Sequence, residues 1–171
     1  MKIIKILAIF IIILVPNLIN SEDFGDKFEL SLDNGNKLWL QKRQNGFLIT
    51  QNAINLQNNQ AILFLFFTTW CPSCKQEYPK FSQINKNYPN LRVIGVLLEN
   101  RTKADIMRFK KAFKIDYEIV ISGYENLSKN LGGIIGTPTT ILLDKQGKII
   151  YKKLGTNDID ELNKTINKLV F

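Results

Sequence analysis

The chain has 171 residues, the size of one domain of about 100–200 residues with some sequence to spare. Hydrophobic residues make up 45% of the chain and charged residues 22%, so it can bury a core and is neither disordered nor collagen-like. It contains no His, which excludes Ser-His-Asp hydrolysis and Cys-His proteolysis, and its net charge of +8 is scattered, so no nucleic-acid binding is expected.

The N-terminus has the pattern of a secretory signal. Lys2 and Lys5 precede an unbroken apolar run over residues 6–15. This run is shorter than the roughly 20 residues that a membrane span needs. The sequence before Ser21 is a poor cleavage site, so cleavage there and retention as an anchor both stay open. We therefore predict export, with residues 1–21 as a signal peptide or membrane anchor.

The segment after this signal predicts β structure. Apolar and polar residues alternate over residues 28–32 and 37–40, on either side of Asp33-Asn-Gly-Asn36, a turn sequence typical of a β-hairpin. Residues 46–50 predict a third short strand. Residues 51–60 predict a polar, Asn-rich connection with a helical turn.

Strands and helices alternate from residue 61 onward. The continuous apolar run at 61–67 fits a strand buried on both faces. This order predicts an α/β fold, in which helices cover both faces of a mixed sheet with a parallel portion and an antiparallel edge. We divide the exported part into an N-terminal β-hairpin extension, 22–60, and an α/β domain, 61–171. The other predicted strands are 91–98, 117–121, 139–143 and 148–151, and the helices are 74–87, 102–114 (with its basic residues on a solvated face), 125–131 and 158–171.

The two cysteines, Cys71 and Cys74, lie where the strand at 61–67 gives way to the helix at 74–87. A helix N-terminus offers unpaired N–H groups and a partial positive charge, so it favours a thiolate at Cys71. Cys74, one helical turn further on, would be shielded by packing and would attack a mixed disulfide formed at Cys71. We predict a redox-active pair with Cys71 as the nucleophile.

Two other interpretations of this cysteine pair are weaker. Zinc normally takes four ligands, and the chain has neither a further Cys nor any His, so no metal site is expected. A copper site of the Cys/His type fails for the same reason. A disulfide between near neighbours removes little entropy from the unfolded chain, which argues against a purely structural bond.

Two segments resemble the signature segments of the thioredoxin superfamily, Trp70-Cys-Pro-Ser-Cys74-Lys-Gln-Glu-Tyr-Pro79 and Gly136-Thr-Pro-Thr139. The resemblance covers residues 61–171 and implies a thioredoxin-like, three-layer α/β/α fold with a central mixed sheet. The segment 99–122, the Glu three residues after the second Cys and the export signal are similar to TlpA/ResA-type extracytoplasmic thiol-disulfide oxidoreductases. Such proteins need no cofactor besides their redox-active disulfide.

The resemblance also assigns roles around the disulfide. Pro138 would be the cis-proline that faces it, and the backbone at Thr137 would pair with a substrate chain. Trp70 would cover the disulfide and contribute to an apolar docking surface, with Pro72 beside it in the substrate-binding site. The alternatives are an ordinary loop proline at Pro138 and core packing for Trp70.

Glu77 is a further candidate site residue. Thioredoxins proper carry a buried acid six residues before the first Cys, and that position here is Leu65. In TlpA/ResA-type proteins the Glu three residues after the second Cys performs the proton transfer of that acid. The resemblance therefore implies that Glu77 is a proton acceptor or modulator for Cys74. The alternative is a solvated surface glutamate.

The resemblance implies a reductase for disulfides of partner proteins in the periplasm or elsewhere outside the cytoplasm. Apocytochrome c is then a plausible substrate, which would place the protein in cytochrome c maturation. The expected partners are disulfide-containing extracytoplasmic proteins and a membrane electron donor of the DsbD or CcdA kind.

Three alternatives to a reductase stay open. The dipeptide between the cysteines is Pro72-Ser73, whereas reductive relatives carry Pro directly before the second Cys, so the direction of electron flow is undecided. A Dsb-like oxidant or isomerase would share the same fold. A peroxidase is disfavoured, because its reactive Cys is paired with an upstream Thr and an Arg rather than with a second Cys. A non-catalytic binding module would use the N-terminal extension to recruit a partner.

Overall fold

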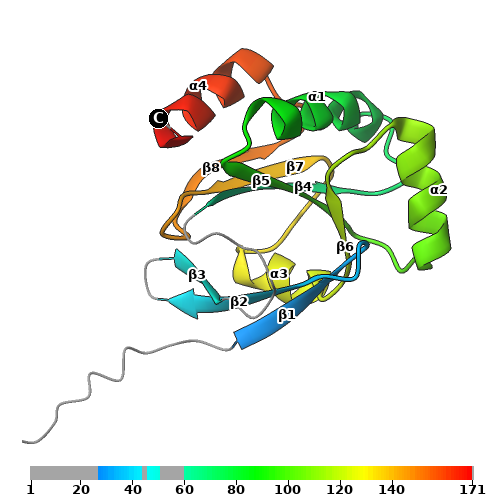
Figure 1. Cartoon of the computed structure of the whole chain (residues 1–171), viewed down its shortest axis with the longest axis horizontal. Helices are drawn as coiled ribbons and strands as arrows, with labels where there is room; N and C mark the ends of the chain where they lie inside the picture. Colours follow the sequence, from blue (N-terminus) through cyan, green and yellow to red (C-terminus); the bar gives the residue numbers. More distant parts are fainter. Residues whose placement is uncertain (1–26, 44–45, 51–59, 171) are drawn as a thin grey trace, which may run out of the picture.

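The structure, a computed structural model, describes residues 27–43, 46–50 and 60–170 (Figure 1). The predicted signal or anchor at 1–21 and nearly all of the predicted connection at 51–60 lie outside the described residues. Within the described ranges, no helix is both long enough and apolar enough to cross a membrane.

One mixed sheet runs through the molecule, with its strands in the order β3-β2-β1-β6-β5-β4-β7-β8. β4 is parallel to β5 and β5 to β6, whereas the other neighbours are antiparallel. The predicted parallel portion is confirmed, and antiparallel strands flank it on both sides. The strands are β1 (Lys27–Leu32), β2 (Lys37–Arg43), β3 (Gly46–Thr50), β4 (Ala61–Phe67), β5 (Leu91–Leu97), β6 (Glu118–Ser122), β7 (Thr139–Leu143) and β8 (Ile149–Leu154).

Helices cover both faces of this sheet, as predicted. Figure 1 shows α1 and α4 on one face and α3 on the other. α2 joins the core of the α1 face through Ile106. The helices are α1 (Cys74–Asn87), α2 (Lys103–Phe113), α3 (Tyr124–Asn130) and α4 (Ile159–Val170).

β4 supplies side chains to both cores of the molecule. All of its residues are buried, as expected for an apolar run at the centre of a sheet. Because successive side chains of a strand point to opposite faces, Leu63 and Leu65 pack under α1 and α4. Phe64 and Phe66 pack on the opposite face, with α3 and the N-terminal strands. The carboxyl end of β4, which the cysteines follow, is thereby packed on both faces.

The N-terminal strands are continuous with the central sheet. β1 pairs with β6, with Ser31 opposite Ser122. Directly after β1, Asp33 Oδ1 accepts a hydrogen bond from the Ile119 N–H at 2.7 Å, and Asp33 Oδ2 pairs with Lys110 Nζ at 2.6 Å. Lys110 was expected on a solvated face of α2, and this is wrong, because its side chain is mostly covered and reaches a buried carboxylate.

Candidate active site

Cys71 and Cys74 form a disulfide at the junction of β4 and α1, with their Cα atoms 5.3 Å apart. The Cys74 N–H, at the first residue of α1, donates to Cys71 Sγ at 3.2 Å. The Ser73 hydroxyl lies 3.5 Å from the same sulfur, and the Ser73 side chain does not cap the helix. The N-terminal end of α1 therefore directs its donors at Cys71, where they would stabilise a thiolate.

The two sulfurs differ in their access to solvent. Cys71 is 3% exposed and Cys74 is 0% exposed. Pro72, between them, is exposed. Cys71 is thus slightly more exposed than Cys74, which is fully enclosed.

The loop before β7 faces the disulfide. The Thr137–Pro138 peptide bond is cis, and the Thr137 carbonyl oxygen lies 3.6 Å from Cys71 Sγ. Two hydrogen bonds fix this loop, from the Gly155 N–H to the Pro138 carbonyl oxygen at 2.8 Å and from Thr139 Oγ1 to the Gly136 carbonyl oxygen at 2.7 Å. The structure thus brings Thr137 and Pro138 to the position that the sequence resemblance implied.

Exposed apolar side chains occur beside the disulfide. Trp70 is 70% exposed, so the alternative that it packs in the core is wrong. Ile135, which precedes the cis-proline loop, is 90% exposed, and Leu154 at the end of β8 is 54% exposed. Leu154 contacts that loop, since its Cδ1 lies 3.1 Å from where a Cβ at Gly136 would be. No sequence pattern singles out Ile135 or Leu154, and Leu154 lies beyond the predicted end of its strand.

Glu77 lies on α1 and is fully buried, so the alternative of a solvated surface glutamate is wrong. Its Oε1 accepts from Lys80 Nζ at 2.9 Å. Its Oε2 accepts from the Asn157 N–H at 3.1 Å and from the Asn157 side-chain amide. Among the hydrogen bonds of the described residues, none joins Glu77 to either sulfur.

A set of polar groups holds Asn157 in this position. Its side-chain amide also donates to Thr140 Oγ1 at 2.8 Å, and its Oδ1 accepts from the Tyr151 hydroxyl at 3.2 Å. Burial, followed by the charges of Glu161, Asp158 and Glu77, raises the pKa of Tyr151 to about 12, so its hydroxyl stays neutral and donates. Sequence reasoning missed Asn157, because no local pattern connects it with α1.

The carboxylate of Glu99, which follows β5, holds the loop that carries Trp70. Glu99 Oε1 accepts from the Thr69 N–H at 2.5 Å, and Glu99 Oε2 accepts from Arg101 Nε at 2.9 Å. Burial alone would raise the pKa of Glu99, but hydrogen bonds from Thr69 and Arg101 and the guanidinium charge outweigh it and hold that pKa below its usual range.

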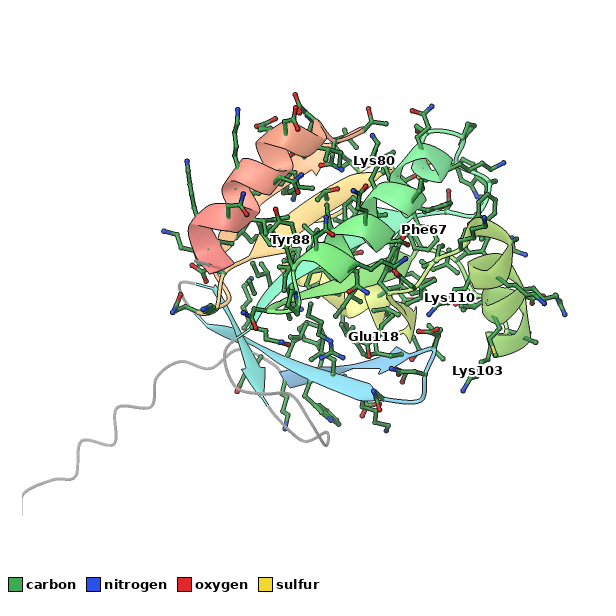
Figure 2. The ribbon with its side chains drawn as sticks, turned by 45° about the horizontal axis from the view of Figure 1, so that its top comes forward. Phe67, Lys80, Tyr88, Lys103, Lys110 and Glu118 are labelled. Atoms are coloured by element: carbon green, nitrogen blue, oxygen red, sulfur yellow. A yellow bond between two sulfur atoms is a disulfide. The ribbon has the colours of Figure 1, made fainter. Side chains whose placement is uncertain are left out.

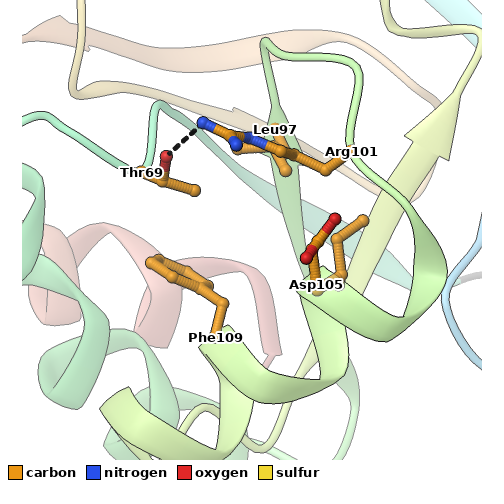
Figure 3. A pocket seen from close by; sticks show the side chains of 6 residues that line it. Thr69, Leu97, Arg101, Asp105 and Phe109 are labelled. Atoms are coloured by element: carbon orange, nitrogen blue, oxygen red, sulfur yellow. Dashed lines mark hydrogen bonds between the residues drawn. The ribbon is translucent and has the colours of Figure 1, made fainter.

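A cavity of about 180 Å³ opens beside this carboxylate (Figure 3). The Arg101 side chain lines it, and Arg101 Nη2 donates to Thr69 Oγ1 at 3.4 Å. The other lining residues are Leu97, Asp105, Ile106 and Phe109. Apolar side chains of β5 and α2 therefore line this cavity together with the polar side chains of Thr69, Arg101 and Asp105.

Comparison with known proteins gives the site a family context. A family model described as Redoxin matches residues 32–169. The sporulation thiol-disulfide oxidoreductase A of Bacillus subtilis (strain 168) is 32% identical over 107 residues, which are 60% of this chain and 64% of that protein. The chain therefore spans just under two thirds of that relative's length.

Two further comparisons cover more of the chain. The thiol-disulfide oxidoreductase ResA of Bacillus thuringiensis subsp. konkukian (strain 97-27) is 24% identical over 139 residues, 78% of this chain and 80% of that protein. The crystal structure of StoA from Bacillus subtilis aligns with a TM-score of 0.61 and 25% identity, over 82% of this chain and 96% of that chain. The fold is thioredoxin-like, as the sequence resemblance implied.

Proposed function

The chain belongs to the Redoxin family, and on that premise we propose that it is an extracytoplasmic thiol-disulfide oxidoreductase that reduces disulfides of partner proteins. The asymmetry of the cysteine pair carries the proposal. Cys71 lies nearer the surface, accepts the Cys74 N–H and faces the cis-proline loop, whereas Cys74 is enclosed behind it. This arrangement suits an attacking thiolate and a resolving thiol.

The reaction then consists of two exchanges. The Cys71 thiolate attacks one sulfur of the partner's disulfide, which forms a mixed disulfide while the other partner sulfur leaves as a thiolate. Cys74 loses its proton and attacks Cys71 Sγ, which forms the Cys71–Cys74 bond and releases the second partner sulfur. The partner gains two electrons and two protons, and the protein dithiol loses them. A dithiol donor outside the chain must return them.

Glu77 is the proposed proton acceptor or modulator for Cys74. The two side chains are three residues apart on α1, so they lie on neighbouring positions of one helix face. Both are fully buried, where a charge on one acts strongly on the other. Glu77 thus influences the step in which Cys74 becomes a thiolate.

The partner would dock as an extended segment across the cis-proline loop. The backbone at Thr137 offers main-chain pairing, and Pro72 and Pro138 bound the approach to Cys71. Trp70, Ile135 and Leu154 offer apolar contacts around it. This combination favours unfolded or extended disulfide-containing proteins, for which apocytochrome c in cytochrome c maturation is a suitable class.

The N-terminal sequence supports a location outside the cytoplasm. Residues 1–21 carry the pattern of an export signal or membrane anchor. An exported reductase has to be recharged across the membrane, so the proposed electron donor is a membrane protein of the DsbD or CcdA kind.

One observation favours a second candidate function, a Dsb-like oxidant or isomerase. The Cys74 N–H and the Ser73 hydroxyl both approach Cys71 Sγ. Donors at this sulfur stabilise the thiolate and with it the reduced form, which raises the reduction potential. The direction of electron flow therefore depends on how strongly these donors act.

Reduction of insulin by the purified chain, with dithiothreitol as electron source, tests the proposed function. We expect Cys71→Ser to abolish catalysis, and Cys74→Ser to accumulate a mixed disulfide with the substrate through Cys71. A Cys71→Ser, Cys74→Ser double variant that fully replaced the wild-type protein in cells would instead support a non-catalytic binding module.

A further inference from the structure

The buried carboxylate of Glu77 has a single charged partner among the contacts of the described residues. Lys80 Nζ lies 2.9 Å from Glu77 Oε1, one helical turn along α1. The Lys80 side chain is 34% exposed and that of Glu77 is 0% exposed, so Lys80 connects the buried carboxylate with solvent. Figure 2 shows Lys80 on α1. Lys80 Nζ also lies 3.5 Å from the Asn157 carbonyl oxygen, to which it donates.

The other partners of Glu77 are neutral. Asn157 donates twice to Oε2 and is itself held by Thr140 and Tyr151. These groups fix the carboxylate in place but leave its charge unchanged. The Lys80 ammonium group therefore compensates the negative charge of Glu77.

Few other ionisable groups face this region. Tyr151 from β8 and Tyr117 just before β6 are both neutral, because burial raises the pKa of each phenol. The charged groups on the neighbouring segments are Asp116 before β6, Asp158 before α4, Glu161 on α4 with Lys153 Nζ at 3.8 Å from its Oε2, and the exposed Lys75 on α1. All of these charged side chains are at least partly exposed, so water screens them more than it screens Glu77.

The carboxylate and Cys74 lie on one face of α1 in a buried, weakly polarisable environment. An uncompensated carboxylate there would oppose formation of a thiolate on either cysteine. With Lys80 in place, the pair carries no net charge. The negative charge of Glu77 then no longer opposes ionisation of the cysteines.

We propose that Lys80 is a positioning residue that cancels the charge of Glu77 and so sets how strongly the Cys71–Cys74 pair reduces its partners above neutral pH. The inference rests on the proposed function, because a potential is relevant only to a pair that exchanges electrons. Lys80 itself contacts neither sulfur in the structure and acts through Glu77.

The test is the reduction potential of the full chain against reference dithiol buffers from pH 5 to pH 9. The variants are Lys80→Met, Lys80→Arg, Glu77→Gln and the Lys80→Met, Glu77→Gln double variant. Lys86→Met is the matched control, because Lys86 lies on the same helix, is exposed and pairs with Asp116 instead. Circular dichroism checks that each variant is folded.

We expect Lys80→Met to lie nearest the wild type at pH 5, where the thiolate fractions are smallest, and to become more reducing toward pH 9. The expected change at pH 9 is about tenfold in the exchange equilibrium, or about 30 mV for two electrons. Glu77→Gln should shift the potential the opposite way at pH 9. Lys80→Arg, the double variant and Lys86→Met should follow the wild-type curve.

A Lys80→Met curve that coincides with the wild type throughout, or that is displaced equally at every pH, would overturn the inference. An equal displacement indicates a structural disturbance, because neutral thiols do not respond to a nearby charge. If Lys80→Met does not fold, the Glu77→Gln and double-variant curves still decide the matter. Failure of the proposed function looks different, since the wild type would then show no reversible potential or no reduction of insulin.

Discussion

Single residues decide the chemistry of this site through their surroundings. Cys71 and Cys74 are three positions apart, yet the first receives a main-chain donor and faces a loop, whereas the second is enclosed. The same principle applies to the acids, since Glu77 is buried against Lys80 and Glu99 holds the Trp70 loop. Each residue's role follows from its contacts more than from its type.

The exposed apolar residues near the disulfide should matter for protein substrates only. We expect Ile135→Ser and Leu154→Ser each to lower kcat/KM for insulin about fivefold, because truncation of a well-placed apolar contact costs about 1 kcal/mol. Reaction of the disulfide with dithiothreitol should not change, since that small molecule needs no docking surface. Ile149→Ser is the control, because Ile149 is also exposed but lies at the other end of β8 from Leu154. Equal losses with both substrates would argue against a docking role.

Glu99 should make stability depend on pH. Its folded-state pKa is lowered, so it contributes stability above the ordinary pKa of a glutamate, and that contribution disappears as the pH falls through the folded value. Glu99→Gln removes this ionisable group. Urea unfolding of both proteins should show their largest difference near pH 7 and a shrinking difference toward pH 3. A difference that stayed constant over this range would contradict the assignment.

At the scale of elements, the turn after β1 is connected to the parallel centre of the sheet. Asp33 binds the Ile119 N–H at the start of β6 and pairs with Lys110 on α2. Gly123, before α3, lies against β1 so closely that a Cβ there would collide with the Glu29 carbonyl oxygen. The N-terminal strands and the α2 and α3 segments are therefore positioned together.

Asp33→Ala should be among the more destabilising substitutions in the described region. It removes a nearly buried carboxylate and leaves both the Lys110 ammonium group and the Ile119 N–H without that partner. Loss of one member of a buried ion pair costs about 3–5 kcal/mol. Asn34→Ala, one residue on, loses two exposed hydrogen bonds, one to Glu118 and one from the Asn36 N–H, and should cost only about 1–2 kcal/mol. Urea denaturation measures both, and similar costs for the two variants would refute this account of Asp33.

At the scale of the molecule, the N-terminal extension contributes to the core. Phe28, Leu30, Leu32, Leu38 and Leu40 are all buried in the cluster under α3. At about 1.5–3 kcal/mol for each side chain, their burial stabilises the fold by about 7–15 kcal/mol. That is similar to the whole stability of a typical domain, about 5–15 kcal/mol. The predicted boundary at residue 60 therefore separates two sequence patterns, but the residues on both sides of it share one core.

Deletion of the extension should therefore prevent stable folding. We expect a chain of residues 61–171 to lack a cooperative thermal transition by circular dichroism, whereas residues 22–171 should unfold in one step. A 61–171 fragment within about 1 kcal/mol of the longer chain would show that the extension is dispensable.

Much of this architecture could be predicted from the sequence, because its signals are local. The apolar run of β4, the Asp33–Asn36 turn and the spacing of the cysteines each specify a structure over a few residues. The family resemblance added the cis-proline at Pro138, which no local pattern requires.

The remaining features depend on contacts between distant parts of the chain. Asn157 is 80 residues away from Glu77, and Asp33 is 77 residues away from Lys110, so no periodicity or motif connects them. The ion pair between Glu77 and Lys80 has a local signal in the sequence, since a Glu and a Lys three positions apart on a helix can pair. What the sequence could not show is that the Glu77 carboxylate would be fully buried while Lys80 stays partly exposed.

The reduction potential of the Cys71–Cys74 pair in residues 22–171, the part of the chain after the predicted signal, decides whether the protein is suited to reduce disulfides. Equilibration with glutathione and dithiothreitol buffers at pH 7 would measure it. The account of a disulfide reductase predicts a value near that of thioredoxin, about −270 mV. A value about 100 mV or more higher, toward the about −120 mV of a strong oxidant, would contradict it and assign the protein to the formation or isomerisation of disulfides.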